Sequence, residues 1–219
     1  MTNKPKDTTY PITKQFSMHF SPYEDRLIVR AQRTDGTEVH MLLTRRMVML
    51  VLQQLLNKLP ELTGLEKTPA VYWQEVLQMA HQGAMASKAA ADREIADQQA
   101  AARADLPAAD DATVAAPEAS NPTDVVPEHL FLATELLVQA GEESLTLAFK
   151  GLPMPDAMVK PSQYQPIFAI PLEVDNVHQL IELLIDKCQH AQWHLPLELP
   201  WIEPPNGDGG NKKYSLRYH

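Results

Sequence analysis

The sequence contains little of several residue types, and each scarcity excludes a class of protein. A single cysteine, Cys188, excludes an internal disulfide framework. With only eight glycines, the chain has no glycine-rich nucleotide fingerprint and few positions for close approach to a cofactor phosphate. No segment approaches the roughly 18 to 20 apolar residues of a membrane helix, and no apolar signal segment follows the first residues. We therefore expect a cytoplasmic protein without a membrane anchor or bound cofactor.

Charge is distributed unevenly along the chain. Residues 1–58 carry nine basic and five acidic side chains, a net charge of +4. Residues 59–128 carry four and twelve, a net charge of −8, and residues 129–219 carry six and eleven, a net charge of −5. Because neutralisation of phosphates supplies most nucleic-acid affinity, the total of −9 argues against general nucleic-acid binding. The basic first quarter still leaves room for a local anion site.

Residues 14–43 predict three antiparallel strands, because apolar and polar residues alternate in each of them. A three-residue loop at 34–36, with Gly36 in the left-handed region, aligns the second and third strands well. A loop shorter by one residue would mix the two faces, so the longer loop is favoured. The favoured register pairs apolar residues on one face, namely Leu27 with Leu43, Val29 with Met41 and Ala31 with Val39.

A helix is predicted over residues 45–59, with Thr44 as its N-cap and Pro60 closing it. Thr68 and Pro69 predict the start of a second helix, which continues on Ala, Gln and charged residues to about residue 103. Its later part has little to bury and is expected to project from the body. The acidic Ala- and Pro-rich segment 105–127 has the composition of a disordered linker.

The second half predicts strands again, followed by a helix. Apolar periodicity in residues 129–140 does not separate strand from helix cleanly, but the following Gly141 and the alternation of 145–149 favour a strand. Residues 167–172 predict another strand, and the prolines beside it place that strand at a sheet edge. A helix over about 176–190 is expected to begin at a cap on Asp175.

These elements predict an α+β fold, with an antiparallel sheet or sandwich formed by strands from both halves and helices 45–59 and 175–190 packed on it. Two independent small domains are the alternative. The expected divisions are 1–68 and 128–192 for the two halves of the core, 69–104 for the long helix, 105–127 for the linker, and 193–219 for an extended Trp- and Pro-rich tail.

Four arginines suggest an anion site. Arg45 and Arg46 lie at a predicted helix start, where free amides favour anions. Two cations there are electrostatically unfavourable unless an anionic partner binds beside them. Arg26 and Arg30 lie on the outward face of the predicted hairpin, which could bind a phosphorylated ligand or nucleic acid. The plainer interpretation is that Arg45 and Arg46 pair with nearby carboxylates or stay solvated, and that the acidic connector covers the hairpin face.

Two further groups of candidate binding residues lie near the C-terminus. Cys188, His190 and His194 have donor types that bind zinc, but no fourth ligand is near, so we expect structural roles and no metal. Trp193, Trp201 and Ile202 belong to a pre-extended apolar segment that suits docking in a groove, either of this protein or of a partner.

The sequence carries no catalytic constellation. We therefore expect a non-catalytic scaffold or adaptor that binds another protein and self-associates. The alternatives are a binder of nucleic acid or phosphorylated ligands at the four arginines, and a metal-dependent enzyme around His190 and His194.

Overall fold

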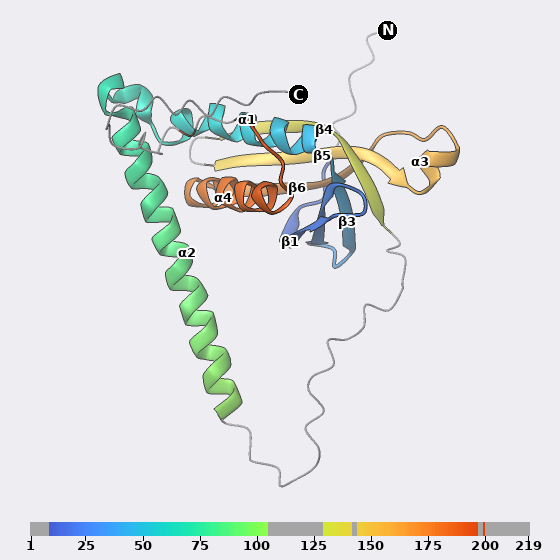
Figure 1. Cartoon of the computed structure of the whole chain (residues 1–219), viewed down its shortest axis with the longest axis horizontal. Helices are drawn as coiled ribbons and strands as arrows, with labels where there is room; N and C mark the ends of the chain where they lie inside the picture. The colour runs from blue at the N-terminus through green and yellow to red at the C-terminus, as the bar shows by residue number, and fades with distance from the viewer. Residues whose placement is uncertain (1–8, 105–128, 142–143, 197–198, 200–219) are drawn as a thin grey trace.

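A computed structural model describes residues 9–104, 129–141, 144–196 and 199 (Figure 1). Its strands are β1 (Thr13–Ser21), β2 (Arg26–Arg33), β3 (Glu38–Leu43), β4 (Leu130–Ala140), β5 (Ser144–Met154) and β6 (Gln165–Glu173). Its helices are α1 (Arg45–Leu62), α2 (Trp73–Ala104), α3 (Asp156–Val159) and α4 (Val174–His190), with short 3-10 turns at Leu65–Lys67 and Ala70–Tyr72.

The six strands form one sheet in chain order, β1 to β6, with the halves joined between β3 and β4. The α+β class and a sheet built from both halves are confirmed. The expectation of a wholly antiparallel sheet is wrong at the junction, where His40 to Leu42 pair in parallel with Leu130 to Leu132. A parallel pair requires a long crossover, and α1, α2 and the chain that follows them supply it.

The register predicted for the β2–β3 hairpin is confirmed pair by pair, from Leu27 with Leu43 to Ala31 with Val39. Gly36 has a φ of +87°, as the three-residue loop requires. Arg33 and Thr37 close this loop by a 2.9 Å backbone hydrogen bond. Arg30 and His40 are directly opposite each other on the outer face.

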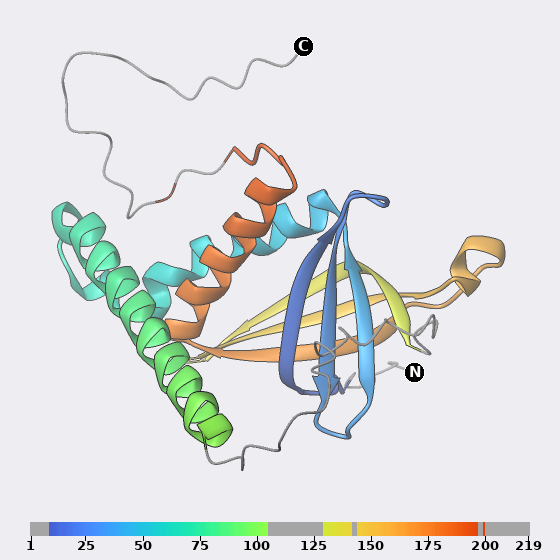
Figure 2. The same ribbon diagram turned by 60° about the horizontal axis from the view of Figure 1, so that its bottom comes forward.

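The two edge strands of the sheet meet at one end. Ile12, just before β1, forms a parallel bridge to Ala169 of β6, and the Ala169 amide donates to the Pro11 carbonyl at 2.7 Å. The Arg33 guanidinium donates to the Ile167 carbonyl beside this bridge. The prediction that the proline-flanked strand lies at an edge is confirmed, because β6 is the last strand of the sheet. The curved sheet is therefore nearly closed at one end and open at the other (Figure 2).

Helices α1 and α4 contact each other and share the main core with the sheet (Figure 2). Thr44 caps α1 as predicted, since its hydroxyl accepts from the Met47 amide at 3.2 Å. The predicted end at Pro60 is wrong, because α1 continues to Leu62. Leu59 and Leu62 are both buried, so packing of the last turn offsets the hydrogen bond that proline cannot donate.

The predicted cap at Asp175 is also wrong. Helix α4 begins at Val174, directly after β6, so Glu173 occupies the N-cap position and Asp175 lies in the first turn. The Glu173 side chain makes no capping hydrogen bond. The start of the second helix differs less from its prediction. The turn Ala70–Tyr72 comes between Pro69 and the first residue of α2.

Helix α2 extends away from the body after its first turns (Figure 1). Leu77 and Ala84 are buried, whereas every residue from 86 to 100 is exposed. The prediction of a projecting helix to about residue 103 is therefore confirmed. Within the described chain, none of the helices combines the length and apolarity that crossing a bilayer requires. The predicted linker 105–127 and most of the predicted tail lie outside the described residues.

Candidate functional site

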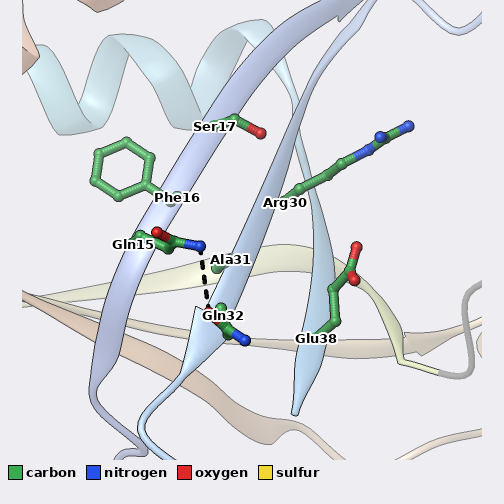
Figure 3. Close-up of a pocket in the computed structure, with 7 residues that line it drawn as sticks. All are labelled: Gln15, Phe16, Ser17, Arg30, Ala31, Gln32 and Glu38. Atoms are coloured by element: carbon green, nitrogen blue, oxygen red, sulfur yellow. Dashed lines mark hydrogen bonds between the residues drawn. The ribbon is translucent and has the colours of Figure 1, made fainter. Parts of the chain in front are cut away.

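The outer face of the β1–β2–β3 sheet carries a hollow of about 440 Å³ that contains one of the predicted anion-binding residues (Figure 3). Arg30 and Glu38 both line this hollow, and Gln15 donates to Gln32 across the strands at 3.2 Å. Glu38 also pairs with His40 at 3.1 Å. The hollow thus contains a carboxylate as well as an arginine, and this carboxylate weakens the attraction for an anion.

The four arginines are spread over two places. Arg26 begins β2, and Arg30 is four residues further along this strand, or about 13 Å away. Arg45 lies at the start of α1, where its guanidinium donates to the His194 carbonyl at 2.8 Å. Arg46 is exposed. The anion site on these residues remains a prediction, and one of the four is already bonded to the chain's own backbone.

The three weak metal candidates do not converge. Cys188 is a buried free thiol facing the core, and burial raises its pKa to about 11, against a small opposing effect of Arg45. His190 is exposed and its Nδ1 lies 3.3 Å from the Asp186 carboxylate. His194 is exposed as well. In the part of the chain that the structure describes, no three His, Cys, Asp or Glu side chains gather as a metal site.

Trp193 packs back on its own molecule, which is the intramolecular alternative for this residue. Its ring lies edge-on to Phe20 with centroids 5.9 Å apart, and its indole N–H donates to the Asp25 carboxylate at 2.6 Å. The side chain is 5% exposed, so it offers little surface to a partner. Trp201 and Ile202, the other tail candidates, lie outside the described residues.

A buried histidine cluster lies in the contact between α2 and α4. The rings of His81 and His178 are 5.5 Å apart, and His81 Nε2 lies 3.9 Å from a Glu182 carboxylate oxygen. The same contact is held by Gln179, whose amide donates to the Ala84 carbonyl at 3.2 Å. These groups thus form polar contacts between α2 and α4.

Both histidines are held in their neutral form. Burial, reinforced by His81 and only slightly opposed by Asp175, lowers the pKa of His178 to about 4. Burial also lowers the pKa of His81, with Glu182 opposing it. The two histidines between α2 and α4 are therefore uncharged near neutral pH, and in acid they would have to take up protons inside the contact.

The face of α2 that meets α4 continues beyond the point where α4 ends its contact. Ile95 follows Leu77 by about five helical turns, so both side chains leave α2 on the same side. Leu77 is 3% exposed against the body, whereas Ile95 is 53% exposed. Ala91 lies between them on this side. We call the residues Lys88, Ala91 and Ile95 the outer face of α2.

A second hollow, of about 390 Å³, lies where β1, β6, α4 and α2 come together. Neither His81 nor His178 lines it. Both this hollow and the histidine cluster escaped prediction from the sequence, because each joins segments far apart in the chain. A usable signal for the cluster was present: His81 and His178 occupy positions on otherwise apolar helix faces.

Comparison of the chain with protein-family models, curated proteins and solved structures finds no match.

Proposed function

We propose that this protein is a non-catalytic, cytoplasmic scaffold that binds other proteins and associates with itself through the outer face of α2. The observation that carries the proposal is that the side of α2 that packs against the body continues along the helix without a neighbour in the described chain. Leu77 and Ala84 use it to contact the body, and Ile95 presents the same side of the helix to solvent. A helix gains most of its stability in proteins from packing, so fifteen exposed residues in a row favour a missing neighbour.

A second copy of the chain is the occupant we propose. A small residue such as Ala91 lets helix backbones approach closely beside one larger side chain, here Ile95. The exposed part of α2 mixes both signs of charge, with Lys88 and Arg93 among Asp92, Glu94 and Asp97. Such a surface is compatible with another copy of itself, whereas a strongly basic or acidic partner would gain little there.

The other features support a binding role and do not point to a reaction. The buried histidines lie in a contact between helices, and none of them lines either hollow. Their neutral state fits a packing role. The free thiol of Cys188 is compatible with the reducing compartment expected from the sequence.

Sedimentation velocity over a wide concentration range tests the proposal. The wild-type chain should show concentration-dependent association, and Ile95→Glu should abolish it by placing a carboxylate in the contact. Ala100→Glu is the matched control, because it adds the same charge to an exposed position on nearly the opposite side of α2. A wild-type chain that stays monomeric throughout, or equal loss in both variants, would refute self-association through this face.

A further inference from the structure

The hollow between the sheet edges has the composition of a ligand site. It is lined on one side by residues of β1 and on the other by residues of β6, with α4 behind them and Lys88 of α2 at the rim. Its volume of about 390 Å³ falls in the range of small-molecule sites, toward the lower end. It adjoins the outer sheet hollow of Figure 3, with which it shares Gln15 and Phe16 on β1, and Lys88 at its rim also belongs to the outer face of α2.

The hollow exists because the edge strands separate after their single bridge. Ile12 and Ala169 hold β1 and β6 together, and a register irregularity between Thr13 and Gln15 follows at once. Beyond it, β1 pairs only with β2, so its inner face is incompletely covered. Phe16 is consequently half-buried, whereas Ala31, its partner on β2, is fully buried.

The walls of the hollow are largely apolar and lead toward the core. They include Ile170 and Leu172 of β6 and Leu180 and Leu183 of α4. Phe16, Ile170 and Leu180 also border a void of about 10 Å³ whose lining is entirely apolar. An apolar chain entering between the strands would therefore cover side chains that water now reaches.

The polar groups at the rim are cationic or neutral. Lys14 and Lys88 both line the hollow, together with the amides of Gln15, Asn176 and Gln179, and no carboxylate of the described chain does. Asp92, which is outside the lining, pairs with Lys88 at 2.6 Å and weakens the attraction of Lys88 for an anion. Lys14 has no ion pair with a described carboxylate, so the rim keeps a positive charge that favours a negatively charged group.

Two further observations concern the same walls. Thr13, which is 8% exposed, lines the hollow, and its hydroxyl has no hydrogen-bond partner in the described chain. Helix α4 begins beside the hollow, and Asn176 of its first turn is part of the lining. Glu173 and Asp175 lie near this helix start but outside the lining, so they limit the attraction without filling the site.

A peptide strand added to the sheet edge is the less suitable occupant. Pro171 lies on β6 within the hollow and has no N–H to donate to an added strand. Pro166 further limits strand pairing along β6. The edge is thus poorly equipped for backbone pairing, while the apolar walls and cationic rim remain available.

We propose that the hollow between β1 and β6 binds a small amphipathic carboxylate, with its apolar chain between the strands and its carboxylate at Lys14 and Lys88. The site shares Lys88 with the outer face of α2, whereas Ala91 and Ile95 do not line it. A ligand there would touch β1, β6, α4 and α2 together, and it would thereby fasten the long helix to the body.

Isothermal titration of the full chain with decanoate tests the site, with decanol as the uncharged comparison. Decanoate should bind with one-to-one stoichiometry below its micellar concentration. Lys14→Gln combined with Lys88→Gln should weaken decanoate binding by about tenfold, while decanol binding changes little. Asn176→Trp, a change at an exposed position on the rim, should block both ligands sterically.

Arg30→Gln is the control, because it alters a cation of the other hollow and should leave decanoate binding unchanged. Circular dichroism of each variant establishes that the fold is retained. The proposal is overturned if decanoate does not bind, or if Asn176→Trp binds it as tightly as wild type. It is overturned equally if an acidic extended peptide binds at this site and decanoate does not bind there.

Discussion

Apart from the short α3 between β5 and β6, the two halves of the chain repeat one order of elements, three strands followed by a helix, but these helices bury different side chains. Helix α1 buries apolar residues only and begins with a side-chain cap from Thr44. Helix α4 buries His178 among its apolar residues, begins without a side-chain cap, and receives α2 on its outer side. The first half is thus dominated by packing, whereas titratable groups, the second hollow and the projecting helix gather around the second.

The largest expected effect tests whether the two halves share one core. Leu55→Ala in α1 and Ile181→Ala in α4 each remove a completely buried side chain and should each lower the free energy of unfolding by about 3 kcal/mol. Urea denaturation followed by both fluorescence and circular dichroism should show one transition that shifts as a whole. Two separate transitions, each sensitive to only one substitution, would mean that the halves fold independently.

The buried histidine predicts an acid sensitivity that belongs to the second half. The pKa of His178 is about 4 in the folded chain and near 6.5 when unfolded, so the unfolded state takes up the proton first. Its contribution to stability is complete above pH 6.5 and is lost as the pH falls toward 4, amounting to about 3 kcal/mol.

Urea denaturation at a series of pH values measures this loss. His178→Leu should remove most of it, since leucine has no proton to gain. His194→Gln is the control, because His194 is exposed and its side chain is not in the core. An unchanged pH dependence in His178→Leu would show that another group governs acid stability.

The helix starts give a smaller contrast between the halves. Thr44→Ala removes the hydroxyl that accepts from Met47 and should destabilise the protein by about 1 kcal/mol. Glu173→Ala removes a side chain that makes no capping bond, so a change of less than about 0.5 kcal/mol is expected. Thermal or urea unfolding of both variants measures the difference. Equal effects would contradict the assignment of the caps.

The smallest effect concerns the rate at which a thiol reagent in solution reacts with the single cysteine. Cys188 is 2% exposed, and burial raises its pKa to about 11, so little thiolate is present or accessible near neutral pH. Ellman's reagent should react slowly with the native chain and rapidly in urea. Fast reaction with native protein would show that the end of α4 opens readily.

Local sequence patterns were sufficient for the strands and for most helix limits. The β2–β3 register could be predicted because a slip of one residue would move Leu27, Val29 and Ala31 to the solvent side. The helix ends predicted at Pro60 and Asp175 were wrong because local sequence does not determine them. Packing of Leu62 and the direct passage from β6 into α4 decided those ends, and neither is a local property.

The remaining features depend on contacts between distant segments. The parallel joint of β3 with β4 links residues about ninety positions apart, and no periodicity in either strand specifies it. The pairing of His81 with His178 and the hollow between β1 and β6 have the same origin. Alternation and capping signals indicate which face of an element is buried, but they do not name its neighbour.

The central claim, that α2 meets a second copy of the chain at its outer face, is tested most directly by an intermolecular distance. A spin label at Ala100→Cys, on the side of α2 away from the proposed contact, reports that distance by double electron–electron resonance in a Cys188→Ser background. Because packed helices lie about 8 to 10 Å apart, the labels of two copies should give a sharp distance of about 40 Å or below. A signal that shows only the uniform background of separate molecules would contradict the account.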